Sequence, residues 1–120
     1  MSFAQRESIS VVTGTGGDGT SYSTVVTGLV DAMHYVKTDY SDGVDFDVTV
    51  ESTGEILWDQ DNVNSATSRR PRFVGHDGTG VALTGTAHAV VPVAVANDRI
   101  KVIVTNGGSV KTGAIVVVLT

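Results

Sequence analysis

Apolar and polar residues alternate with a period of two along several segments of this chain, which is the pattern of a strand with one buried face. The clearest case is residues 44–51, where acidic or hydroxylated residues occupy every second position. The apolar positions between them are Val44, Phe46, Val48 and Val50. We predict a strand here, and the Ser-Thr-Gly turn that follows it predicts a strand returning alongside.

The last quarter of the chain predicts two further strands joined by a turn. Residues 99–105 place Ile100, Val102 and Val104 on one face. The Asn-Gly-Gly-Ser sequence that follows tolerates the positive φ of a chain reversal. Residues 113–120 then form an apolar, mostly β-branched run without alternation. Such a run is typical of a strand buried on both faces.

Weaker patterns predict the remaining strands. The first spans residues 6–13, with Ile9 and Val11 facing inward, and a glycine-rich hairpin loop follows it. Further short strands are predicted at residues 81–83 and 90–96.

Residues 22–38 are open to two interpretations. Helical spacing of several apolar residues permits a helix, but β-branched residues are frequent and Gly28 interrupts the run. Because glycine within a strand often marks a bulge or bend, we favour one bent strand or two strands. With about seven or eight strands in all, the sequence predicts an all-β fold, an antiparallel β-sandwich or small barrel.

The chain is short enough to form one domain, so we predict a single β domain over residues 1–120. Residues 1–5 are predicted to be a flexible N-terminal arm. Residues 59–80 are predicted to be a long loop, and loops of this length in compact domains are often functional.

This predicted loop carries the one basic cluster of the sequence, which consists of Arg69, Arg70 and Arg72. Arginine presents a planar fork of donors that suits carboxylates. Two interpretations have equal weight: these arginines contact an acidic partner surface, or they belong to a solvated loop.

Composition excludes several classes of function. The 120 residues include no cysteine, which rules out disulfides and thiolate metal sites. Eight basic and 13 acidic residues give a net charge of −5, which argues against binding to nucleic acid. No apolar run approaches the ~18 residues of a membrane helix, and the first residues lack the layout of a signal peptide. We therefore expect no membrane partner and no export.

The candidate motifs for chemistry are weak. Residues 14–19 match G-x-G-x-x-G, but strand-forming residues follow and no phosphate-binding lysine is present. His34, His76 and His88 lie singly, without the spacing of metal ligands, and no nucleophile motif accompanies them. We therefore predict no catalytic residue, no cofactor and no enzymatic activity.

Acidic side chains gather in two parts of the sequence, and their oxygens offer an alternative in which calcium binds. The two sets are Asp39, Asp42, Asp45 and Asp47, and Asp59, Asp61, Asn62 and Asn64. Neither set has the spacing of an EF-hand loop. We therefore interpret both as solvated turns and strand faces, and predict no metal.

Several short words of the sequence carry a resemblance to a known class of proteins, from about Tyr22 onward. They are STGEILW at 52–58, DNVNSAT at 61–67, RPR at 70–72, ANDRIKV at 96–102, and the glycine turns at 107–108 and 111–113. This series resembles small virion structural proteins of tailed bacteriophages, and head decoration proteins in particular. In such proteins these words are structural, as glycine turns and strand ends.

The resemblance implies a protein made in the bacterial cytoplasm that binds the capsid surface of the virion and stabilises the head. The expected partners are the major capsid protein or other virion proteins, together with further copies of the chain in a homo-oligomer, for example a trimer. One alternative is a component of the head–tail junction or tail. An alternative of another class is a carbohydrate- or receptor-binding β-sandwich module, although the aromatic content of 6% is low for a sugar site.

Overall fold

Strands account for the regular structure of the chain, as the alternating pattern predicts. The computed structural model describes residues 4–74, 76, 78–82 and 90–120, and it contains no helix in that part. No helix among the described residues is therefore available to cross a membrane. The strands are β1 Gln5–Val12, β2 Gly19–Tyr22, β3 Val26–Val36, β4 Val44–Val50, β5 Ile56–Val63, β6 Thr67–Arg69, β7 Phe73–Val74, β8 Val90–Val91, β9 Val93–Asp98, β10 Ile100–Thr105 and β11 Thr112–Leu119.

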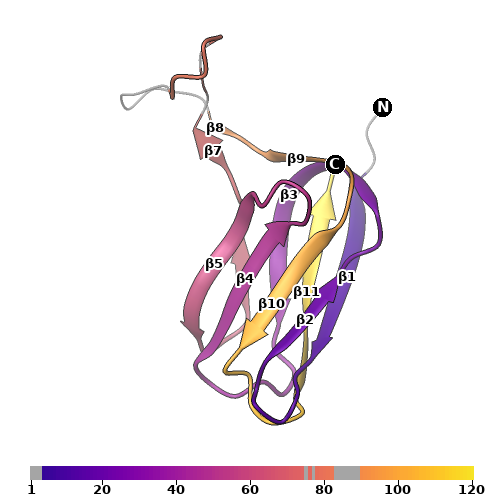
Figure 1. Cartoon of the computed structure of the whole chain (residues 1–120), viewed down its shortest axis with the longest axis vertical. Helices are drawn as coiled ribbons and strands as arrows, with labels where there is room; N and C mark the ends of the chain where they lie inside the picture. The colour runs from indigo at the N-terminus through magenta and orange to yellow at the C-terminus, as the bar shows by residue number, and fades with distance from the viewer. Residues whose placement is uncertain (1–3, 75, 77, 83–89) are drawn as a thin grey trace.

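Two antiparallel sheets lie face to face (Figure 1). The first sheet has the order β1-β11-β3-β6, with β9 also paired to β3, and the second has the order β2-β10-β4-β5. The short strands β7 and β8 form a separate two-stranded ribbon. The prediction of an all-β, antiparallel sandwich-like fold is thus confirmed.

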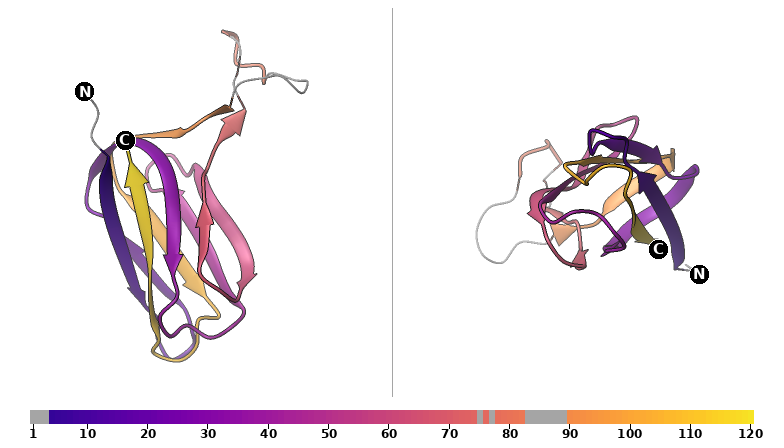
Figure 2. Two further views of the ribbon diagram at one scale, coloured as in Figure 1. Left: turned by 180° about the vertical axis from the view of Figure 1, so that it is seen from behind. Right: turned by 90° about the horizontal axis from the view of Figure 1, so that it is seen from below.

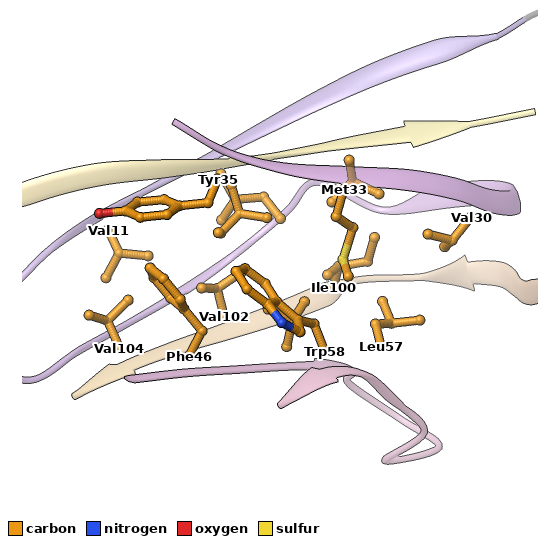
Figure 3. Close-up of a cluster of buried hydrophobic side chains, with 14 of the residues drawn as sticks. Val11, Val30, Met33, Tyr35, Phe46, Leu57, Trp58, Ile100, Val102 and Val104 are labelled. Carbon is orange, nitrogen blue, oxygen red and sulfur yellow. The ribbon is translucent and has the colours of Figure 1, made fainter. Parts of the chain in front are cut away.

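The core lies between the two sheets, where the inward residues of both interdigitate (Figure 3). The predicted inward residues of β1, β4 and β10 are all buried there. Phe46 is only 1% exposed, and its ring centroid lies 4.7 Å from that of Tyr35 and 5.0 Å from that of Trp58. Aromatic rings at such separations attract one another in addition to burying apolar area. The alternation of β4 therefore gave the correct inward face.

The prediction that the last strand is buried on both faces is wrong. Along β11, Gly113, Ile115, Val117 and Leu119 are buried, whereas the residues between them are only half-buried. The apolar run reflects the central position of β11 between β1 and β3 rather than a second covering layer.

Within residues 22–38 the chain forms the end of β2 and all of β3, and no helix, which confirms the favoured interpretation. The register between β3 and β9 shifts between Val26 and Gly28, and Gly28 has φ of 148°. A Cβ at this position would lie 3.0 Å from the main-chain oxygen of Thr120. Gly28 thus permits the irregularity that a side chain would obstruct.

The sequence predicted a hairpin loop after β1, and this prediction is wrong. β1 belongs to the first sheet and β2 to the second, so the loop carries the chain across the sandwich. A local pattern of strand, glycines and strand cannot distinguish these two connections, because both require only a tight reversal.

The predicted long loop at residues 59–80 is also wrong, because β5 continues to Val63 and both β6 and β7 lie in this segment. Irregularities in the β4–β5 register break the alternation of β5, which explains why the period-two pattern ends early. The strands accordingly exceed the predicted seven or eight. At the N-terminus β1 already begins at Gln5, and residues 1–3 of the predicted arm lie outside the described residues.

Two other predicted strands are changed. Residues 90–96 are divided at Pro92 into β8 and β9. Of the predicted strand at residues 81–83, Ala82 forms an isolated bridge with His76, while Leu83 lies outside the described residues, as does His88.

Candidate docking surfaces

Two short strands lie end to end along one side of β3. β6 pairs with the second half of β3, where Met33 lies opposite Arg69, and β9 pairs with its first half, where Val30 lies opposite Val93. Both run antiparallel to β3, so they are two halves of one edge strand, and the chain leaves the sheet between them. In this excursion β7 and β8 pair beyond the end of the two sheets (Figures 1 and 2). We call β7, β8 and residues 70–72 the arm.

Arg72 fixes the base of the arm to β3. Its Nη1 donates to the main-chain oxygens of Asp31 and Val30 at 3.1 and 3.4 Å, and its Nη2 donates to Asp31 Oδ1 at 3.1 Å. On the side of β3 away from β11, no strand in the described part of the chain pairs with β3 between its partners in β6 and β9. Arg72 therefore supplies donors at the gap in the edge strand, and the charge of Asp31 strengthens the attachment.

Arg69 has a different role, because it links the two sheets. Its Nη2 donates to Gln60 Oε1 on β5 at 2.6 Å, and its guanidinium lies 5.6 Å from the centre of the Trp58 ring. The indole Nε1 of Trp58 donates to the same Gln60 oxygen at 2.9 Å. Arg69 thus closes one side of the sandwich and covers its one tryptophan.

Arg70 is the most exposed of the three arginines. Its Nη1 reaches Asp31 Oδ2 at 3.4 Å, but its side chain remains 64% exposed. The structure therefore separates the predicted partner-contact cluster into two arginines that hold the domain together and one that faces solvent. The sequence analysis missed Asp31 as the partner of Arg70 and Arg72, although a carboxylate within a mostly apolar segment was a signal for it.

The ribbon of the arm exposes apolar side chains. Phe73 lies opposite Val91 and Val74 lies opposite Val90, and three of these four residues are exposed, Val90 by 55%. An isolated two-stranded ribbon is at best marginally stable in water. The arm is therefore the first candidate docking surface.

The opposite end of the sandwich is a second candidate, built from the loops at residues 13–18 and 106–111. The main-chain N–H of Thr13 donates to Lys111 O at 2.9 Å, and that of Val110 donates to Gly14 O at 3.1 Å. Lys111 in turn donates its N–H to Thr13 Oγ1 at 2.8 Å. We call these loops the loop end.

Val110 is an unusual residue at the loop end. Its φ is 49°, in the left-handed region, and its side chain is 61% exposed. Positive φ is a true outlier for a β-branched residue, and such strain persists only where the surroundings impose it. Here the bonds between the two loops impose it and hold an apolar side chain toward solvent.

Two amides of the glycine-rich loop are engaged within the loop itself. Gly14 N–H donates to Asp18 O, and Gly17 N–H donates to Gly14 O. Gly17 also accepts from the N–H of Gly107 at 2.9 Å. The glycines therefore serve the contact between the two loops, which supports the structural interpretation of this motif.

Tyr40 anchors the loop end to the core. Its hydroxyl donates to Val11 O at 2.5 Å, and its ring lies against Gly113, where a Cβ would approach within 2.3 Å. Burial, followed by the neighbouring Tyr35 hydroxyl, raises the pKa of Tyr40 far above its usual range. Tyr40 is therefore a neutral hydrogen-bond donor at any ordinary pH.

The outer face of the second sheet combines acidic and apolar side chains. Asp47 lies directly opposite Asp59 in the β4–β5 register, an arrangement of like charges that is destabilising. Ile56 and Tyr22 are exposed on the same face, and Ile103 lies beside Asp47. We call this surface the acidic face.

Asp45 lies on β4, as Asp47 does, but its carboxylate is hydrogen-bonded within the domain. The main-chain N–H of Asn62 and the side-chain amide of Asn106 donate to its carboxylate at 2.9 and 2.8 Å. These bonds, that from Asn62 first, lower the pKa of Asp45. Its carboxylate therefore holds Asn62 of β5 and Asn106 of the turn after β10.

Among the described residues there is no group of three acidic or histidine side chains that could hold a metal ion. The two described histidines are separate. His34 Nδ1 lies 2.8 Å from Ser68 Oγ on the first sheet. His76 forms the isolated β-bridge with Ala82, in the segment between β7 and β8.

Comparison of this chain with protein-family models, with curated proteins and with solved structures found no match. The structure itself defines the class of fold, which is a two-sheet, antiparallel β-sandwich with a projecting arm.

Proposed function

We propose that this chain is a structural protein of a tailed-bacteriophage virion, where it decorates the assembled capsid lattice and stiffens the head. The resemblance of its short words to virion proteins supports the assignment to this class. In the structure most of those words form strands and turns of the sandwich, whereas RPR at 70–72 belongs to the arm.

The observation that carries the proposal is the exposed, strained Val110 at the loop end. A non-glycine residue at positive φ costs about 1–3 kcal/mol, and the exposed side chain gains little burial within the domain in return. A rigid apolar point is suited to docking on a preformed surface, because little conformational entropy is lost on binding. Modest contacts of this kind become effective when many copies bind one lattice.

The carbohydrate-binding alternative loses its main candidate platform. Trp58 is buried beneath Arg69, so its ring face is not presented to a sugar.

Copy number in purified particles tests the proposal. Decoration of a lattice requires copies on the order of hundreds, whereas a ring at the head–tail junction requires about six or twelve. A copy number in the lower range would overturn the decoration role and favour the junction or tail.

Substitution of Val110 tests the docking surface. Val110→Asn places a residue that tolerates positive φ, so we expect equal or higher stability, by up to about 1 kcal/mol. Because the apolar contact is removed, binding to particles assembled without this protein should weaken at least tenfold. The matched control is Val25→Asn, since Val25 is 58% exposed and belongs to neither the arm nor the loop end. Equal binding of Val110→Asn and the parent chain would refute the loop end as the lattice contact.

A further inference from the structure

The arm is positioned to reach beyond its own domain. Arg72 ties its base to β3, and the β7–β8 ribbon lies past the end of both sheets (Figure 2). The exposed side chains of Phe73, Val90 and Val91 are therefore not covered by the sandwich from which they project. Because a two-stranded ribbon gains little stability alone, these side chains call for a covering surface.

Charge indicates which surface covers them. Arg70 and Arg72 give the arm a net charge of +2. The remaining six basic and 13 acidic residues of the chain carry −7. The chain is thus polarised, and the body of another copy is electrostatically complementary to the arm.

The acidic face has the composition that this arm would fit. Its Asp47 and Asp59 oppose each other in register, so a cation from outside relieves their repulsion. The exposed side chain of Ile56 adds apolar area on the strand of Asp59, and Ile103 lies opposite Asp47. Tyr22 lies on the far edge strand of this sheet, where Arg99 covers its ring and Lys101 lies opposite it. The arm presents the matching set, with the mostly exposed Arg70 next to the apolar ribbon.

We propose that the arm of one copy packs across the acidic face of a second copy, so that the chain forms a homo-oligomer through arm exchange. The apolar side chains of the ribbon cover Ile56 and Ile103, and Arg70 lies against the Asp47–Asp59 pair. This inference does not depend on the virion assignment, since it concerns only copies of this chain.

Sedimentation velocity of the purified full chain tests the oligomer. The parent should sediment at a multiple of 12.4 kDa, and Val90→Asp should sediment as one chain. The control Val25→Asp changes a residue of similar exposure outside both surfaces and should keep the parent mass. Unfolding curves establish that each variant is folded. A parent that remains a single chain at high concentration, or an oligomer that Val90→Asp leaves intact, would overturn the proposal.

A charge exchange tests which surface the arm contacts. Arg70→Glu and Asp59→Lys should each raise the dissociation constant of the oligomer at least tenfold, and the double variant should recover most of the loss. High salt should weaken the parent oligomer, because it screens exposed charges. If the double variant is as weak as the single ones, the acidic face is not the acceptor and the proposal is wrong.

The two proposals can fail separately. A single chain that decorates particles would refute arm exchange and leave the virion role standing. An oligomer that contains the arm contact but binds no particle would refute the virion role and leave arm exchange standing.

Discussion

Replacement of Arg72 by alanine should destabilise the domain, although ion pairs at protein surfaces usually contribute little. The Arg72 side chain is 28% exposed and contacts the main-chain oxygens of Pro71, Asp31 and Val30 as well as the Asp31 carboxylate. Because Nη1 carries two hydrogens, these three main-chain contacts count as two hydrogen bonds. Each contributes about 0.5–1.5 kcal/mol net. The ion pair adds about 0–1 kcal/mol. We therefore expect Arg72→Ala to lower the free energy of unfolding by about 1.5–3 kcal/mol.

Arg70→Ala is the matched control. Arg70 lies two positions before Arg72 and contacts the same Asp31 carboxylate. Arg70 is 64% exposed, and its one described polar contact is the 3.4 Å pair with Asp31, so the loss should be about 0–1 kcal/mol. Urea unfolding measures both. For a domain of this size the melting temperature should fall by about 6–12 °C for Arg72→Ala and by less than about 4 °C for Arg70→Ala.

Arg72→Lys separates the fork geometry from the charge. Lysine retains the positive charge but cannot reproduce the planar set of donors, so it should recover less than half of the loss. Hydrogen exchange should also accelerate at the main chain of β3 around Asp31 in Arg72→Ala. Equal losses of stability in Arg72→Ala and Arg70→Ala, or full recovery of stability in Arg72→Lys, would refute the role of Arg72. That role is to supply donors to β3 at the gap between β6 and β9.

Phe46→Ala should cost about 3–5 kcal/mol, because the ring is buried among other aromatic residues and its removal leaves a cavity; a loss below about 1 kcal/mol in urea unfolding would contradict this packing. Tyr40→Phe should cost about 0.5–1.5 kcal/mol through loss of the bond to a main-chain oxygen, whereas Tyr35→Phe should be neutral or stabilising, since the Tyr35 hydroxyl is buried without a partner in the described part of the chain. Equal losses in these two variants would contradict the assignment. The pKa of Asp45 is lowered in the folded state, so its contribution is present above the usual aspartate pKa of about 3.9 and is lost as pH falls through the folded value. Asp45→Asn should therefore reduce the difference in stability between neutral and acid pH, measured by denaturant unfolding, and an unchanged difference would argue against it.

The sequence by itself determined the strands whose alternation is regular. In β4 and β10 every second residue must face either the core or solvent, so a local pattern is enough to identify both the strand and its inward face. The same reasoning decided for strand in residues 22–38, where Gly28 marks the irregularity that the structure shows. The residues after the glycine-rich motif also predicted a strand rather than a helix, which β2 confirms.

Tertiary structure alone decided the roles of the arginines. Arg69, Arg70 and Arg72 are adjacent in sequence, yet one reaches across to Gln60 on the opposite sheet and the other two reach Asp31. These contacts join residues that are far apart in the sequence. They depend on the register of β3 with β6 and β9, the two halves of its edge strand.

The loop end could not be predicted from the sequence, for the same physical reason. The positive φ of Val110 opposes the residue's own preference, so local propensity predicts against it, and only the bonds to the Gly14 loop impose it. Alternation records which residues are buried, because burial acts on each position separately. The side chains that meet at a gap, an edge or a turn are set by the closure of the whole sandwich, which no local pattern encodes.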